Sequence, residues 1–343
     1  MKKRLAFAIL VGIALFFGSC CNEAGNNFPT DKKEIMDNFV AGTLDPSYVP
    51  AAFFIHYDAD SKIGEPAVKA HMEYILKANS DILKVQFEQG LSRMEDPTKQ
   101  ESWDAIEPVP LDFYRPTLEI IARLQEIAGA NIYVIPTVYS PYHVATQITG
   151  IEGAKEGAVN HPEDLKRIIG YCSDALKWLV AECKKIGIQG FYLTSQGGEM
   201  LYYDIPEYFE TFVKPYDLDF MNYCCEGTKM NFLHICDWEG PYDDLTRFAD
   251  YPGQIINTPI NLNGKEFTAS EGEALFNRPV LGGLDRHGEI NSADPEGVKA
   301  IVRKAIEDGP KGRLMMGAEC TVSSAPIENI QAAVSAAHNY GKE

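Results

Sequence analysis

The sequence predicts an α/β fold in which one parallel sheet closes into a single (β/α)8 barrel. Eight short, apolar, strand-like runs occur along the chain, most are followed by a helical stretch, and several are apolar almost without interruption. Uninterrupted apolar strands are typical of parallel sheets, because helices cover both of their faces. The length of 343 residues also suits one barrel of roughly 200–400 residues. A doubly wound open sheet is the alternative.

The expected strands and helices alternate from residue 50 to the C-terminal region. The strands comprise residues 50–58, 82–87, 131–139, 188–195, 230–237, 253–261, 278–285 and 312–321. The helices comprise residues 65–79, 116–129, 161–187, 294–310 and 325–341. Pro326 lies in the first turn of the last helix and Gly341 at its end, as is usual for helix boundaries. Residues 140–150 are expected to form a loop.

The beginning of the chain has the features of an export signal. A basic start at residues 2–4 precedes an apolar stretch, residues 5–17, that is too short to cross a membrane as a helix. Small residues then lead to Cys20, a pattern that resembles a bacterial lipoprotein signal. We therefore expect cleavage before Cys20 and attachment of lipid to its thiol. An ordinary secretory peptide is the alternative.

This pattern divides the chain into three parts. We expect a signal peptide over residues 1–19, a lipidated cysteine with a polar tether over residues 20–47, and the barrel over residues 48–343. The protein would then be exported to the bacterial cell envelope and held at a membrane by its lipid anchor only. The formal net charge of −18 argues against nucleic acid as a partner, because its phosphates require a basic surface.

His234, Cys236 and Cys320 form a candidate zinc site. Side chains two residues apart on a strand point to the same face, so His234 and Cys236 would project together from strand 230–237. Cys320 ends strand 312–321, and the functional groups of such barrels gather at the C-terminal ends of the strands. Zinc binds histidine nitrogen and cysteine sulfur, and three protein ligands leave its fourth position open. The alternatives are a disulfide between Cys236 and Cys320, or a chance combination.

Further polar residues stand at the ends of the expected strands, and each either lines a pocket or caps the loop and helix that follow. They are Tyr139, Asp285, His56, Asp58, Gln86 and His287. Tyr139 and Asp285 are expected to contact substrate, and His287 adjoins Asp285 in the same candidate pocket. For His56, Asp58 and Gln86 both interpretations stay open. His143 is expected on the surface or at a helix cap.

Several stretches of the chain resemble the uroporphyrinogen decarboxylase superfamily, in particular its zinc-dependent methyltransferase branch. They are residues 81–88, 137–142, 232–237, 279–322 and 325–341, of which the last two are the most specific. The resemblance covers about residues 48–343 and implies a (β/α)8 barrel of the uroporphyrinogen decarboxylase type. In the methyltransferase branch, the corresponding residues ligate zinc, which here implies His234, Cys236 and Cys320. Cobalamin-independent methionine synthase uses a similar set of ligands.

The chain departs from the decarboxylase in two places. No arginine-rich loop follows residues 53–61, although the decarboxylase has one there for the carboxylates of its substrate. The late Gly-His-Gly motif of the decarboxylase is replaced by Gly-Ala-Glu-Cys at residues 317–320. Both differences weaken the expectation that this chain decarboxylates a porphyrinogen.

Three functions follow from these observations. The leading hypothesis is a zinc enzyme that activates a thiol for methyl or alkyl transfer, with a corrinoid as a candidate methyl donor. The second is decarboxylation of a tetrapyrrole, as the wider superfamily implies. The third is a surface lipoprotein that binds a corrinoid, a tetrapyrrole or another small ligand without catalysis. Each hypothesis makes a small molecule the main partner.

Overall fold

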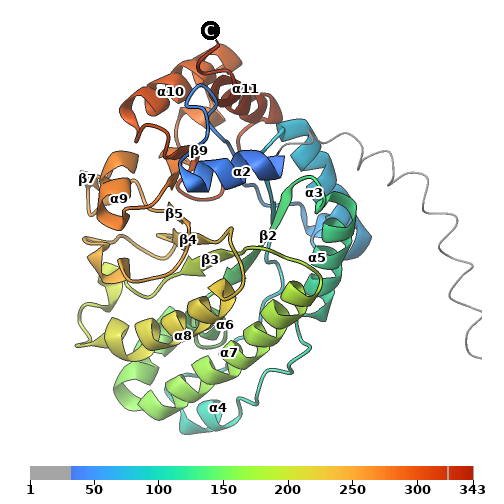
Figure 1. Cartoon of the computed structure of the whole chain (residues 1–343). Helices are drawn as coiled ribbons and strands as arrows, with labels where there is room; N and C mark the ends of the chain where they lie inside the picture. Colours follow the sequence, from blue (N-terminus) through green and yellow to red (C-terminus); the bar gives the residue numbers. More distant parts are fainter. Residues whose placement is uncertain (1–31, 323, 343) are drawn as a thin grey trace, which may run out of the picture.

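The computed structural model describes residues 32–322 and 324–342, which form a curled parallel sheet surrounded by helices (Figure 1). The expected signal peptide, Cys20 and the first part of the expected tether lie outside the described residues. Within the described residues, no helix combines the length and the apolar composition that crossing a membrane requires.

The sheet follows the order of the chain, as a barrel requires. Its seven parallel strands are β1 (Ile82–Val85), β2 (Tyr133–Tyr139), β3 (Tyr192–Ser195), β4 (Phe232–Ile235), β5 (Ile255–Asn257), β8 (Val280–Leu284) and β9 (Leu314–Ala318). Neighbours pair in the order β1-β2-β3-β4-β5-β8-β9. Each of these strands falls within a predicted run, and the barrel-like α/β fold predicted from the sequence is confirmed.

The first predicted strand, residues 50–58, is not a regular strand. It nevertheless occupies the position between β9 and β1, because Ala52 N–H donates to Met316 O and Met316 N–H donates to Pro50 O. On the other side, Asp81 N–H donates to Ala51 O. Pro50 has no N–H to donate, and the N–H of Ala51 binds the carboxylate of Asp81 at 2.7 Å. The missing N–H of Pro50 and the side-chain bond of the Ala51 N–H interrupt the ladder of backbone hydrogen bonds where the barrel closes.

Helices cover the outside of the sheet. They are α3 (Gly64–Ala78), α5 (Arg115–Ala128), α6 (Pro141–Asn160), α7 (Pro162–Lys185), α8 (Lys214–Cys225), α9 (Ala269–Phe276), α10 (Pro295–Asp308) and α11 (Ile327–His338). A short helix and a hairpin lie within connections, namely α4 (Gln100–Asp104) and β6 (Asn261–Leu262) with β7 (Lys265–Glu266). The five helices predicted from the sequence correspond to α3, α5, α7, α10 and α11.

The prediction of a loop at residues 140–150 is wrong, because α6 begins there. Ser140 caps the helix by accepting from His143 N–H, and Pro141 occupies the first turn. Both are helix-start signals. Gly150 then adopts φ 73°, which interrupts the helix without ending it. The helix therefore lies directly after β2, at the end of the barrel where the candidate ligands gather.

Part of the expected tether belongs to the folded domain. Residues Lys32–Ala41 form helix α2, which lies across the end of the barrel formed by the first residues of the strands (Figure 1). Met36 and Phe39 are buried there against the barrel interior, including Tyr133 and Phe232. Lys32, which falls within the expected tether, is buried and donates to Asp81. Helix α2 is therefore part of the folded domain.

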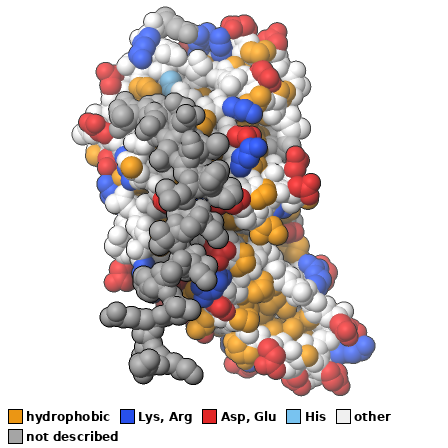
Figure 2. All heavy atoms as spheres, turned by 90° about the vertical axis from the view of Figure 1, so that its right-hand side faces the viewer, with side chains coloured by type: hydrophobic (Ala, Val, Ile, Leu, Met, Phe, Trp, Pro, Cys, Tyr) orange, Lys and Arg blue, Asp and Glu red, His pale blue; other side chains and the backbone are white. Residues whose placement is uncertain are grey.

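Figure 2 shows the charged side chains on one side of the molecule. On the described part of this face, acidic and basic side chains are interspersed, and basic side chains occur singly among acidic ones.

Asp81 joins four segments at the N-terminal end of the barrel. Its carboxylate accepts from Lys32 Nζ at 2.7 Å, from Tyr48 Oη at 2.7 Å and from Ala51 N–H, and pairs with His338 Nε2 at 2.8 Å. Burial by itself raises the pKa of Asp81, but the bonds from His338 and Lys32 outweigh it and hold the pKa below its usual value. The interaction connects α2, the closing segment, β1 and α11.

Asp81→Asn is expected to lower the free energy of unfolding by about 3–5 kcal/mol at pH 7, because it leaves the buried ammonium group of Lys32 without its carboxylate. The pKa of Asp81 is lowered in the folded state, so its contribution is present above the unfolded pKa of about 3.9 and is lost as the pH falls through the folded pKa. Urea titration at several pH values measures both effects. The control is Asp308→Asn, which removes an exposed pair with Lys304. Equal stabilities of the two variants would contradict this role of Asp81.

Candidate metal centre

Strand β4 and its hydrogen bonds to the neighbouring strands position His234 and Cys236. His234 lies on β4, in register with Thr194 of β3 and Asn257 of β5, and is buried. Cys236 follows the end of β4, where its N–H donates to Ser195 O at 3.0 Å. The extended backbone turns both side chains toward the barrel interior. Cys320 comes two residues after the end of β9.

The structure brings the three predicted ligands together at the C-terminal end of the barrel. One nitrogen of His234 and the sulfurs of Cys236 and Cys320 lie within 4.8 Å of one another. Both cysteines are free thiols, so the disulfide alternative does not describe this structure. Ligands bound to one tetrahedral zinc at about 2.0–2.3 Å are about 3.3–3.8 Å apart, so shortening the longest separation by about 1.0–1.5 Å would give zinc its geometry.

The chemistry of the donors also fits zinc. The set is one imidazole and two thiols, which zinc accepts and which magnesium and calcium do not favour. Nδ1 of His234 is buried and has no hydrogen-bond partner among the described residues. A buried polar atom without a partner is unusual. The three residues present therefore fit a zinc ion with one position open to a further ligand.

The two thiols affect each other because they are close and buried. A hydrogen bond from the Cys236 thiol, together with the neighbouring His234 ring, holds the pKa of Cys320 well below its usual value against the effect of burial. Cys236 keeps the shared proton, and its pKa is raised by this hydrogen bond and by burial. The site therefore favours one thiolate before any metal binds, and thiolate is the form that binds metals.

A cavity of about 260 Å³ opens in front of the three ligands. Its lining comprises His56, Lys84, Gln86, Thr137, Tyr139, His143, Tyr192, Thr194, Gln196, His234, Cys236, Trp238, Glu239, Cys320 and Thr321. A second hollow, of about 520 Å³, adjoins it over α6 and the loop at residues 93–97, and shares His143 and Glu239 with it. The cavity can thus admit a small ligand to the candidate metal position.

The sequence-predicted pocket residues divide into two groups. Tyr139, His56 and Gln86 line the cavity. Asp58, Asp285 and His287 are exposed and do not belong to its lining. Asp285 instead accepts from the N–H of His287 at 2.7 Å, the loop contact that was the alternative interpretation. Burial raises the pKa of Tyr139 far above neutral pH, so its hydroxyl stays protonated and can donate a hydrogen bond.

Lys84 was missed by the sequence analysis and lies inside the cavity. Its ammonium group donates to Gln86 Oε1 at 2.8 Å and lies 4.7 Å and 4.8 Å from the ring centres of Phe54 and Tyr192. Burial lowers the pKa of Lys84 to about 8, although the nearby Cys320 raises it. A signal was present, because a lysine inside an apolar barrel strand, two residues before Gln86, points inward with it.

The expectation that His143 lies on the surface is wrong. Because residues 141–160 form a helix directly after β2, the His143 ring lies against Tyr139, with 4.3 Å between ring centres, and lines the cavity. Burial lowers its pKa to about 4, so the imidazole is neutral at physiological pH. Its Nδ1 is buried and has no hydrogen-bond partner among the described residues.

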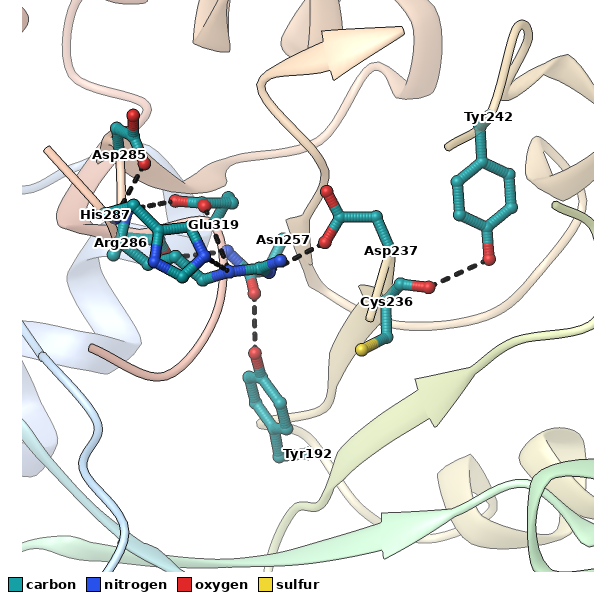
Figure 3. A network of polar contacts seen from close by, with 10 residues as sticks. Tyr192, Cys236, Asp237, Tyr242, Asn257, Asp285, Arg286, His287 and Glu319 are labelled. Carbon is teal, nitrogen blue, oxygen red and sulfur yellow. Dashed lines mark hydrogen bonds and ion pairs between the residues drawn. The ribbon is translucent and has the colours of Figure 1, made fainter. Parts of the chain in front are cut away.

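Asn257 supports the floor of the site. Tyr192 Oη donates to Asn257 Oδ1 at 2.5 Å, and the Asn257 amide donates to Leu281 O and Ala318 O (Figure 3). These bonds connect β3, β5, β8 and β9 beneath the candidate ligands. The Tyr192 ring also packs on His234, with 5.1 Å between ring centres. Together they limit the positions that the imidazole can adopt.

Comparison with known proteins identifies the family. The family profile described as uroporphyrinogen decarboxylase (URO-D) matches residues 67–340. The chain belongs to this family. Among curated proteins, no significant sequence match was found.

Solved structures share the fold of this family member. A methyltransferase from Methanosarcina mazei has 13% sequence identity and a TM-score of 0.71, covering 91% of this chain and 99% of that one. A B12-independent methionine synthase from Shewanella sp. W3-18-1, solved in complex with selenomethionine, has 11% identity and a TM-score of 0.49, covering 80% of this chain and 86% of that one. The first likeness shows the barrel-like fold.

Iodoacetamide is expected to alkylate Cys320 of the metal-free protein faster than Cys225 at pH 7. Both are half-buried, but the pKa of Cys320 is lowered, whereas burial raises the pKa of Cys225 to about 11. Since its lowered pKa keeps Cys320 ionised as the pH falls, the ratio of the alkylation rate of Cys320 to that of Cys225 should increase below pH 7. Mass spectrometry of peptides measures the rates. Cys236→Ala removes the thiol that donates to Cys320 and should slow the alkylation of Cys320. An unchanged rate in that variant would contradict the assigned coupling.

Proposed function

We propose that this member of the uroporphyrinogen decarboxylase family is a zinc-dependent enzyme that activates a thiol for methyl or alkyl transfer. One observation carries the proposal, namely that His234, Cys236 and Cys320 converge at the cavity although they come from distant parts of the chain. The zinc ligands, the thiol substrate and the methyl donor are all part of this proposal.

A zinc ion held by these three residues would favour the ionised form of a thiol, because a nearby cation stabilises negative charge on sulfur. The cavity supplies the surroundings that make such a thiolate reactive. The cavity is narrow and is partly lined by aromatic rings, so the sulfur loses much of its hydration. A less hydrated thiolate is a stronger nucleophile toward carbon, and the lining favours transfer over hydrolysis by limiting water.

The polar residues of the cavity can orient the rest of the substrate. Tyr139 presents a protonated hydroxyl, and His143 presents a neutral ring. Lys84 supplies the one ammonium group of the described lining, and Gln86 supports it. These groups suit a small, polar thiol. The volume is also near the lower end for ligand pockets, which run from about 300 to 1,000 Å³.

The transfer itself balances simply. The thiol loses its proton to solvent, its sulfur forms a bond to the methyl carbon, and the bond between that carbon and the donor breaks with its electron pair staying on the donor. A corrinoid is a suitable class of methyl donor, because its cobalt can accept the electron pair of the broken bond. The hollow that adjoins the cavity at His143 and Glu239 gives a donor an approach to the sulfur. The solved structure from Methanosarcina mazei that shares this fold is described as a methyltransferase, which favours methyl transfer among the candidate reactions.

Decarboxylation of a tetrapyrrole, which the family description favours, has less support in the site. The described lining contains one lysine and no arginine, whereas a substrate with many carboxylates requires several cationic partners. The cavity is also small for a macrocycle. Binding of a small ligand without turnover is the third interpretation, and the experiment below separates it from catalysis.

The purified protein is expected to contain about one zinc per chain, and Cys236→Ser and Cys320→Ser are each expected to lose most of it, since each removes one of three ligands. Elemental analysis measures the metal. Cys225→Ser, a half-buried cysteine outside the site, is the control and should retain zinc. Supplied with methylcobalamin and small thiols, the zinc-loaded protein should form methyl thioethers, detected by mass spectrometry.

Two results would reject parts of this proposal. Stoichiometric zinc that neither cysteine substitution affects would reject the ligand assignment. Stoichiometric zinc without thioether formation from any of the thiols would favour a binding protein over a methyltransferase.

We also propose that the protein is an exported lipoprotein anchored through Cys20, which rests on the sequence pattern of residues 1–20. In a bacterial host fed labelled palmitate, the protein should take up label, and Cys20→Ser should abolish it. Cys21→Ser, at the neighbouring cysteine, is the control and should keep the label. Equal labelling of both variants would exclude the anchor.

A further inference from the structure

Arg286 lies between the two loops that carry the candidate cysteine ligands (Figure 3). It follows β8, and its side chain is largely buried, with 9% exposed. Its Nη1 donates to Asp237 Oδ1 at 2.7 Å, and its backbone N–H donates to Glu319 Oε2 at 2.8 Å. Its Nε lies 3.6 Å from Glu319 Oε1. One residue thus binds two carboxylates from different loops.

The two carboxylates adjoin the two sulfurs in the sequence. Asp237 directly follows Cys236, and Glu319 directly precedes Cys320. Trp238, the next residue in the first loop, places its ring 5.9 Å from the guanidinium group. A carboxylate that is held in place restricts the backbone of its own residue, and therefore that of the adjacent cysteine, because adjacent residues share a planar peptide unit.

The sheet alone does not hold these loops together. β4 and β9 are not neighbours, since β5 and β8 lie between them in the order of the sheet. No ladder of backbone hydrogen bonds therefore fixes the separation of Cys236 and Cys320. Metal ligands need such support from surrounding residues, because a displacement of about 1 Å is enough to spoil a site. Arg286 spans this gap from β8.

We propose that Arg286 is a positioning residue, which holds the loops of Cys236 and Cys320 at the separation that a shared metal ion requires. The inference rests on the proposed zinc site and assigns its preorganisation to one side chain that does not touch the metal. The guanidinium donates to Asp237 through Nη1 and to His287 Nε2 through Nε at 3.0 Å, and its Nε lies 3.6 Å from Glu319, so one planar cation attracts both carboxylates.

Charge and geometry predict opposite effects of removing this residue. Arg286→Met takes a positive charge away and leaves Asp237 and Glu319 unneutralised near the site, so electrostatic attraction alone would strengthen the binding of a divalent cation. Loss of positioning would weaken binding instead, because the two sulfurs must then be ordered by the metal itself. Substitution of residues that orient ligands typically lowers metal affinity by about 10–100-fold. Whether the affinity for zinc rises or falls in Arg286→Met therefore distinguishes the effect of charge from the effect of positioning.

The experiment measures zinc affinity of the full-length, metal-stripped protein by competition with a chromophoric chelator. Arg286→Met is expected to bind zinc about 10–100-fold more weakly than the unaltered protein. Arg286→Lys, which keeps the charge but not the fork, is expected to recover only part of the loss. The matched control is Arg313→Met, which removes the pair with Glu273 at 2.7 Å on another part of the barrel, and it should bind zinc like the unaltered protein.

A second readout reports the sulfurs directly. With cobalt in place of zinc, absorption by sulfur-to-cobalt charge transfer records whether both thiolates bind. This absorption should weaken in Arg286→Met and persist in Arg313→Met. Asp237→Asn keeps Arg286 and changes a half-buried loop residue, so it tests the same contact if Arg286→Met does not fold, and it too should weaken zinc binding.

Unchanged or tighter zinc binding by folded Arg286→Met, while the unaltered protein binds zinc, would overturn the positioning role and leave the proposed function standing. Failure of the unaltered protein to bind zinc would overturn the proposed function itself. Zinc binding that follows the expected order without methyl transfer would support the role of Arg286 and reject the catalytic proposal.

Discussion

The candidate site depends on the curvature of the parallel sheet. β4 and β9 are separated by two strands, so on a flat sheet their ends would lie too far apart for one ion. The curled sheet turns the end of every strand toward a common opening, and the imidazole of His234 meets the sulfurs of Cys236 and Cys320 there. The segment at residues 50–54, bonded to both β9 and β1, maintains this curvature.

The two ends of the barrel are built differently. At the N-terminal end, the buried carboxylate of Asp81 receives donors from Lys32, Tyr48 and Ala51. At the C-terminal end, Nδ1 of both His143 and His234 is buried and has no partner among the described residues. Such groups cost stability, and these two belong to residues that line the cavity.

The charges around the cavity also have a consistent arrangement. Two buried thiols share one proton, the ammonium group of Lys84 lies in the cavity, and the guanidinium of Arg286 neutralises the carboxylates beside the cysteines. Burial keeps His143 neutral and Tyr139 protonated. The thiols of Cys236 and Cys320 are the sulfur nucleophiles of the described lining of the cavity.

The α/β barrel, most of its strands and helices, and the meeting of His234, Cys236 and Cys320 at one end of the barrel could be predicted from the sequence, because these depend on local periodicity and on the rule that functional groups follow strand ends. The sequence did not predict α6, the position of His143, the inward position of Lys84 or the packing of α2. Those depend on which segments meet in space. Asp285 shows the same limit, since a strand-end position does not decide whether a side chain faces the cavity or its own loop. Only the tertiary structure settled that, because the contact energies of a side chain come from neighbours that are distant in the sequence.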